Sequence, residues 1–112
     1  MVALNHSGKL NALADPRRRE IFEILAFGPQ SVAQIAQKLP VTRPAVSQHL
    51  KVLMDAGLVT FRPVETRHLY RIDAAGVLAI RDYFDHMWRT ALESFKQEAE
   101  LAYVNSKDKN HE

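Results

Sequence analysis

The sequence predicts a mainly α-helical protein with a small two-stranded β-wing, which is a winged helix-turn-helix domain. Two observations support this prediction. Two short apolar patterns with helical spacing, each preceded by a capping residue, are separated by a tight turn, as in a helix-turn-helix. Two runs rich in β-forming residues follow directly, on either side of a polar tip, and indicate a hairpin.

The first predicted helix lies in "LADPRRREIFEILAFGP". Asp15 is placed to cap it, and Pro16 occupies the first helical position, where its missing N–H costs nothing. Gly28-Pro29 ends the helix, because glycine adopts the left-handed backbone that follows many helices. The apolar residues that recur at helical spacing, and therefore form its buried side, are Ile21, Phe22, Ile24 and Leu25.

The next two helices form the helix-turn-helix. In "SVAQIAQKLP", Ser31 and Gln34 have the spacing of a capping box, and Pro40 stops the helix. After the turn, Thr42 is placed to cap the second helix, and Gly57 supplies the left-handed residue that ends it. The hairpin follows as "LVTFRPV" and "RHLYRI", joined at Glu65-Thr66, with a proline that marks a bulged or edge strand.

From Asp73 onward the pattern is helical again, and residues 77–103 would span about 40 Å at 1.5 Å per residue. A helix that is apolar on two sides needs two partners, and we expect one to be a second copy of the chain across a two-fold axis. The polar residues 105–112 are expected to form a disordered tail, which leaves residues 1–104 as one domain. The stripe assigned to the dimer interface is Val77, Ile80, Phe84, Met87 and Ala91. The second, broader face is Leu78, Trp88, Leu92 and Phe95.

The exposed face of the second helix of the helix-turn-helix predicts DNA binding. With Val46 set at zero and about 100° per residue, Leu50 and Leu53 fall on the core side, whereas Gln48 lies roughly opposite, at about 200°. A glutamine can bond the N6/N7 edge of adenine, and Arg43 can reach guanine or a phosphate. The remaining candidates offer hydroxyls or cations for phosphates, and in the wing for backbone or minor groove. The predicted DNA-binding residues are Thr42, Arg43, Pro44, Ser47, Gln48, Lys51, Arg62 and Arg67.

Charge and composition agree with a nucleic-acid partner. Residues 1–72 hold ten Lys/Arg and five Asp/Glu (+5), and residues 73–112 hold five and eight (−3), which together make the net charge of +2. There is no cysteine, so disulfides and thiolate metal sites are excluded, and a cytoplasmic location is expected. No apolar run is long enough for a bilayer and no secretory signal is apparent. No nucleophile motif or phosphate loop appears, so we expect neither an enzyme nor a cofactor.

The segments "LADPRRREIFEIL", "SVAQIAQKLPVTRPAVSQHLKVLMDAGLV" and "RHLYRID" together resemble the ArsR-type family of winged-helix repressors. The resemblance runs over residues 10–72 and more loosely into the last helix, and "VSQHLKVLMDAGLV" is its most specific part. It implies a homodimer that represses transcription from a short palindromic operator, with terminal helices at the dimer interface. It places the recognition helix on residues 43–56 and the wing on residues 62–67.

The sequence departs from the metal-sensing members of that family. Their cysteine motif is absent, and their carboxylate/histidine site on the terminal helix would be represented here only by Asp82 and His86, with Asp85 beside them. We therefore expect no metal site, and a metal-responsive repressor using Asp82 and His86 is the alternative. A second alternative is a winged helix that binds another protein and not DNA. The sequence leaves two roles open for the three arginines at 17–19. They contact a phosphate or the dimer partner, or they form ion pairs along the helix, as between Arg19 and Glu23.

Overall fold

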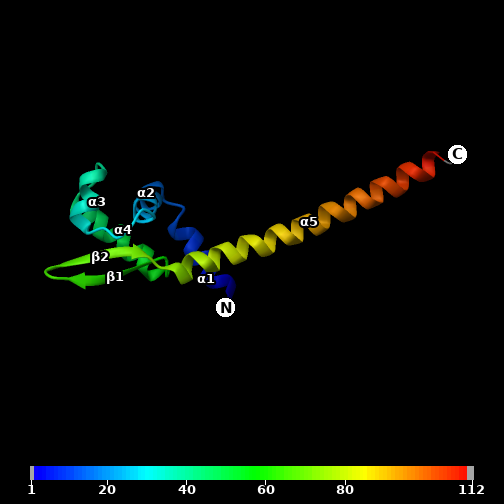
Figure 1. The fold of residues 1–112 in the computed structure, drawn as a ribbon. Helices are drawn as coiled ribbons and strands as arrows, with labels where there is room; N and C mark the ends of the chain where they lie inside the picture. Colours follow the sequence, from blue (N-terminus) through cyan, green and yellow to red (C-terminus); the bar gives the residue numbers. More distant parts are fainter. Residues whose placement is uncertain (1, 111–112) are drawn as a thin grey trace. The chain divides into compact units, whose positions relative to one another are not determined.

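The chain begins with a helix that the sequence pattern did not predict, and the predicted elements follow in order (Figure 1). The computed structural model describes residues 2–110, and the side chains of residues 7–107. The elements are α1 (Val2–Ala12), α2 (Pro16–Leu25), α3 (Val32–Lys38), α4 (Arg43–Asp55), β1 (Val59–Val64), β2 (Arg67–Ile72) and α5 (Ala74–Asn110). They divide into one unit that ends at Ile80 and another that begins at Arg81, so α5 contributes to both.

The caps of the helix-turn-helix lie where the sequence predicts them. The side chain of Asp15 accepts a hydrogen bond from the backbone N–H of Arg18 at 3.0 Å. Ser31 and Gln34 form a complete capping box, and the hydroxyl of Thr42 accepts a bond from the N–H of Ala45 at 3.3 Å. Each cap satisfies a backbone donor that has no partner within its own helix, so the starts of α2, α3 and α4 are confirmed.

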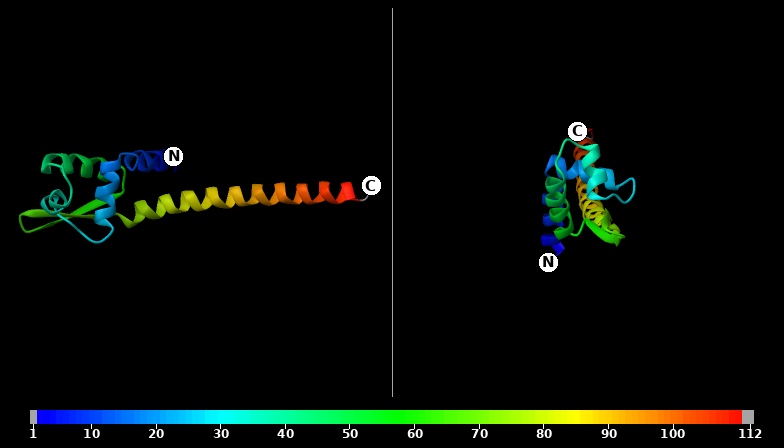
Figure 2. Two further views of the ribbon diagram at one scale, coloured as in Figure 1. Left: turned by 90° about the horizontal axis from the view of Figure 1, so that it is seen from above. Right: turned by 90° about the vertical axis from the view of Figure 1, so that its left-hand side faces the viewer.

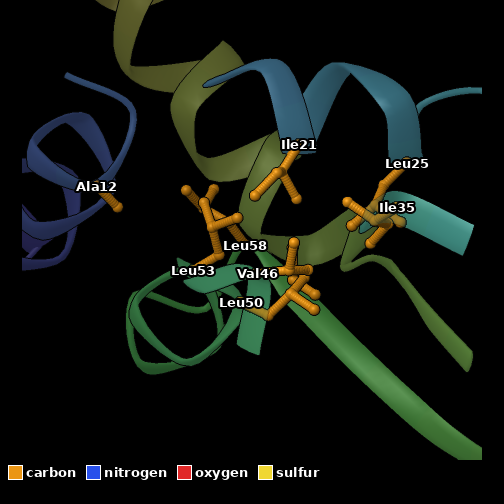
Figure 3. Close-up of a cluster of buried hydrophobic side chains, with 9 residues drawn as sticks. Ala12, Ile21, Leu25, Ile35, Val46, Leu50, Leu53 and Leu58 are labelled. Carbon is orange, nitrogen blue, oxygen red and sulfur yellow. The ribbon is translucent and has the colours of Figure 1, made fainter. Parts of the chain in front are cut away.

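The core of the first unit lies between α2, α3 and α4 (Figure 3). Val46, Leu50 and Leu53 of α4 are completely buried, which confirms the predicted helical phase. Ile21 from α2 and Ile35 from α3 are equally buried against them. Because three of the buried side chains lie on one side of α4, the opposite side of that helix is left to solvent.

The two strands form an antiparallel hairpin. The pairs run without interruption from Val59 opposite Ile72 to Val64 opposite Arg67, so Pro63 lies on an edge strand and not in a bulge. Figure 2 (left) shows α3 between α4 and the hairpin, whose turn forms a free end. The base of the hairpin is bonded to the segment before α3, since Gln30 and Tyr70 exchange two backbone hydrogen bonds of 2.9 and 2.8 Å.

The unpredicted helix α1 is held at its C-terminal end by arginines of α2. The guanidinium of Arg18 donates to the carbonyl of Ala12 at 2.7 Å, and that of Arg19 donates to the carbonyl of Leu13 at 3.1 Å. Cations are favourable there, because the carbonyls at a helix end carry partial negative charge. Arg17 lies 3.4 Å from Glu20. Pairing along the helix, one of the two alternatives left open for these arginines, is thus found for Arg17 and also for Arg18, which lies 3.9 Å from Asp15, whereas Arg19 bonds the carbonyl of Leu13 in place of Glu23.

The last helix is longer than expected. It begins at Ala74 and continues to Asn110, so residues 105–110 are helical where the sequence led us to expect a disordered tail. Residues 97–110 contain neither glycine nor proline, and nothing in that stretch interrupts the backbone hydrogen bonding. Residues 111 and 112 of the predicted tail lie outside the described part of the chain.

Candidate nucleic-acid interface

The side of α4 that faces away from the core carries the predicted recognition residues. Arg43, Pro44, Ser47, Gln48 and Lys51 are all exposed, and they lie opposite the buried stripe of the same helix. Glutamine, arginine and serine offer hydrogen-bond donors and acceptors, which base edges and phosphates require. The face is therefore polar, cationic and exposed to solvent.

An open hollow of about 420 Å³ lies between α4, the first turn of α3 and the hairpin. It brings together three of the predicted residues, Arg43, Ser47 and Arg67, which come from two different elements. Gln48, Lys51 and Arg62 are not among its lining residues. The others that line it are Ser31, Val32, Ala33, Thr66, His68 and Tyr70.

The lining residues that the sequence did not predict come from the start of α3 and its cap, from the turn before β2 and from the inner face of β2. The capping box marks where α3 starts, but only the folded structure shows that this turn lies beside the hairpin. His68 was predicted to pack, and it does stack on Phe61 with ring centroids 4.4 Å apart, although it remains exposed. Tyr70 and Ile72 pack against the core, as predicted.

Two arginines and no carboxylate line the hollow, and this charge balance favours an anion there. Neither Arg43 nor Arg67 has an ion-pair partner among the side chains of residues 7–107. Lys51, farther along α4, has a partner in Asp55 at 3.8 Å, and both side chains are about 70% exposed. An exposed pair of this kind is worth little, so a phosphate can replace the carboxylate at small cost.

The wing arginines lie on the face of the hairpin that points away from the core. Strand residues alternate between faces, and the pairs Arg62–Leu69 and Val64–Arg67 therefore share one face. Both arginines are exposed. The turn between the strands includes Glu65 with a positive φ of 59°, a conformation that costs a non-glycine residue about 1 kcal/mol or more.

The terminal helix exposes both of its predicted apolar faces. Phe84 and Met87, of the stripe assigned to the dimer interface, are 50% and 48% exposed, and Ala91 is half-buried. Ile80 differs from them because it packs against the core of the first unit. Trp88 on the second face is 58% exposed. Large apolar side chains exposed in a row usually mark a surface that another chain covers.

The residues considered for a metal do not fit such a site within one chain. Among the side chains of residues 7–107, no three histidine, aspartate or glutamate groups lie close enough to hold an ion. The carboxylate of Asp82 lies 3.2 Å from the guanidinium of Arg81, and that of Asp85 lies 3.0 Å from Arg89. Both pairs are exposed and therefore worth little, like that of Lys51, so the argument against a metal within one chain is the absence of a third ligand among these side chains. Separately, no helix within residues 2–110 has the length and apolar character needed to cross a membrane.

Comparison with known proteins identifies the family. A family model described as "Bacterial regulatory protein, arsR family" matches residues 15–60, which cover the helix-turn-helix. The chain is 52% identical over 86 residues to HTH-type transcriptional regulator Rv2034 of Mycobacterium tuberculosis, covering 77% of this chain and 80% of that protein. It is 33% identical over 64 residues to the arsenical resistance operon repressor of Staphylococcus xylosus, covering 57% and 62%.

The fold agrees with solved structures of the same family. One is the homodimeric winged helix-turn-helix DNA-binding domain of a possible ArsR-family transcriptional regulator from Mycobacterium bovis, which is 29% identical. It superposes with a TM-score of 0.62 and covers 83% of each chain. The winged helix-turn-helix predicted from the sequence is therefore confirmed, and the chain belongs to the arsR family of bacterial regulatory proteins.

Proposed function

We propose that this protein is a homodimeric transcriptional repressor that binds a palindromic operator through α4 and the hairpin. The observation that carries the proposal is the position of the exposed face of α4 beside a cationic hollow. That helix is 13 residues long, about 20 Å, which suits the major groove of B-DNA. The family membership supports regulation and not catalysis, and a regulator of transcription would act in the cytoplasm.

Within this proposal, base recognition belongs to Gln48 and Arg43. Gln48 points away from the core and can bond the N6/N7 edge of adenine with both its carbonyl and its amide. Arg43, at the start of α4, can make a bidentate contact with guanine or with a phosphate. Pro44, in the same turn, is exposed and can contact a thymine methyl group.

Phosphate contacts then come from the edges of the site. Ser47 lines the hollow, and Thr42 keeps its hydroxyl hydrogen free to donate while its oxygen caps α4. Lys51 exchanges Asp55 for a phosphate, and the wing arginines Arg62 and Arg67 approach backbone or minor groove. These contacts position the protein without reading the sequence of the DNA.

We place the dimer interface on the stripe of Val77, Ile80, Phe84, Met87 and Ala91. A two-fold axis through Phe84 would set Val77 opposite Ala91 of the second copy, and Ile80 within one residue's rise, about 1.5 Å, of the level of Met87, so that every member of the stripe has an apolar neighbour. The half-exposed Phe84 and Met87 would lose most of their contact with water. Two α4 helices related by this axis would read the two halves of a palindrome.

Two substitutions on the same face of α4 test the proposal. Gln48→Ala should lower the preference for an operator, selected from a random pool, over random DNA by about 1–3 kcal/mol, because a base contact is lost. Lys51→Ala, the matched control, should weaken binding to all sequences alike. Competition gel shifts measure, for each variant, the ratio of its affinity for the operator to its affinity for random DNA. An unchanged specificity ratio in Gln48→Ala would show that another side chain reads the bases.

A further inference from the structure

A second hollow, of about 430 Å³, lies between α2 and the end of α3 and shares no lining residue with the one beside α4. Ile24 and Leu39 are half-buried in it and also pack against the core. Phe27, in the turn after α2, is 93% exposed, which makes it the most exposed large apolar side chain of residues 7–107. Exposed apolar surface rimmed by polar groups usually marks a contact with another chain. The residues that line this hollow form the Phe27 face, which consists of Glu20, Glu23, Ile24, Phe27, Lys38 and Leu39.

The turn that carries Phe27 is ordered by its backbone. The N–H of Phe27 donates to the carbonyl of Ile24 at 3.2 Å, and the N–H of Gly28 donates to the carbonyl of Leu25 at 3.1 Å. Gly28 has a φ of 139°, which few other residues adopt, and Pro29 after it has a restricted φ of its own. Because the turn is already ordered, covering the ring would cost little backbone entropy.

The Phe27 face carries one uncompensated charge of each sign. Glu20 is paired with Arg17 at 3.4 Å. Glu23 and Lys38 are exposed, and neither has an ion-pair partner within 4.0 Å among the side chains of residues 7–107. Lys38 donates to the neutral side-chain carbonyl of Gln30 at 3.2 Å. The anion belongs to α2 and the cation to the end of α3, so a two-fold axis between two such faces can set each charge against its opposite.

We propose that the Phe27 face binds the same face of a second copy, so that homodimers associate further, into tetramers first. Each Phe27 ring enters the hollow of the other copy over Ile24 and Leu39, and Glu23 of each copy pairs with Lys38 of the other. DNA fits this face less well because Glu23 would repel its phosphates. A partner of one charge sign would leave either Glu23 or Lys38 unpaired. The inference adds a second interface to the dimer of the proposed function and involves no DNA.

Sedimentation equilibrium of the whole chain without DNA tests the contact. The wild-type mass should rise from dimer toward tetramer with a Kd on the order of 100 µM, because so small a face resembles weak, transient interfaces. Phe27→Ser should weaken this step at least tenfold, because an aromatic side chain at the centre of a contact usually dominates its affinity. Its melting temperature should stay that of the wild type, since the ring is exposed in its own chain.

Charge reversal distinguishes the paired contact from general adhesion of an exposed ring. Glu23→Lys gives the face two cations, and Lys38→Glu gives it two anions, so each variant alone should associate about tenfold more weakly than the wild type. An equimolar mixture of the two variants should recover the wild-type association, because each lysine then meets a glutamate of the other variant. The mixture is the matched control, since it contains both substitutions, and thermal melting of each variant verifies the fold.

Three results would overturn the inference. A wild type that stays dimeric at every concentration would leave the Phe27 face to a different protein. A tetramer that persists in Phe27→Ser would assign the association to another surface, and a mixture that associates no better than its components would show that the two ion pairs do not form. A wild type whose smallest species is a monomer would instead refute the dimer of the proposed function, whereas the dependence of its association on Phe27 would still decide this inference.

Discussion

Replacing Gly76 with alanine should destabilise the protein, although alanine is the better helix former. Gly76 lies in the first turn of α5 and is buried against the turn between α4 and β1. A Cβ at this position would overlap the carbonyl oxygen of Gly57, lie 2.9 Å from its carbonyl carbon and 3.3 Å from the Cα of Leu58. These are backbone atoms, so no side chain can rotate away to relieve the contact.

The size of the expected loss in folding stability of Gly76→Ala follows from two opposing effects. Alanine in place of glycine within a helix gains about 1 kcal/mol. Overpacking a rigid site costs about 1–3 kcal/mol, and the upper end applies because the turn is held by two backbone bonds of 2.9 Å, from Asp73 to Leu58 and from Leu58 to Leu53. The net loss is therefore about 2 kcal/mol, which lowers the melting temperature by roughly 8 °C in a chain of this size.

Gly8→Ala is the matched control. Gly8 is an exposed residue of α1, and a Cβ there would meet nothing within 4 Å, so the helix gain of about 0.5–1 kcal/mol stands alone. Circular dichroism melts at one protein concentration compare both variants with the wild type, because dimerisation would make the midpoint depend on concentration. If Gly76→Ala melts at or above the wild-type temperature while Gly8→Ala gains as expected, the argument from close approach is wrong.

Three further outcomes are expected. Ala91→Glu should sediment as a monomer and bind operator weakly, because two unpaired carboxylates would be buried at the proposed interface; a mutant that stays dimeric would move the interface to the other face. The backbone N–H of Arg18 lowers the pKa of Asp15 below its ordinary value of 3.8, so this cap stabilises the fold above that pH and the effect is lost as the pH falls through the lowered pKa. The difference in urea midpoint between wild type and Asp15→Ala should accordingly be present at pH 7 and vanish in acid, whereas a difference that persists in acid would assign it to packing. Stoichiometric Zn²⁺ should change operator affinity by less than about 1 kcal/mol, and chelator-reversible release that disappears in His86→Ala would establish the metal-responsive alternative.

The elements with local signals were predictable from the sequence. The starts of α2, α3 and α4 each depend on a cap that bonds a residue three positions away, and Gly57, with φ of 78°, ends α4 as its type suggests. Helix starts and ends of this kind are decided by residues close together in the sequence, so their positions could be predicted from the sequence alone. The phase of α4 was equally accessible, because the same helical period that buries Leu50 exposes Gln48.

The remainder depends on contacts between distant residues. Helix α1 contains Gly8 and lacks a regular apolar stripe, and its C-terminal end is bonded by arginines that follow it in the chain. Pairing rules within a helix cannot anticipate that Arg19 bonds the carbonyl of Leu13 and not Glu23. The hollow beside α4 likewise requires the first turn of α3 and the inner face of β2 to meet, which no spacing along the sequence indicates.

The bridge between Gln30 and Tyr70 fixes the hairpin at its base and leaves its turn free to move. Its base is bonded on one side to the segment before α3, whereas the strand pairs nearer the turn bond only to each other. The backbone displacements of the hairpin must therefore increase from Tyr70 toward the turn at Glu65. Helix α4, the proposed recognition helix, is packed through Val46, Leu50 and Leu53 and has no such freedom. In the proposed complex, the rigid helix α4 can thus set the position of the protein along the DNA. The more flexible hairpin can follow the local width of the groove.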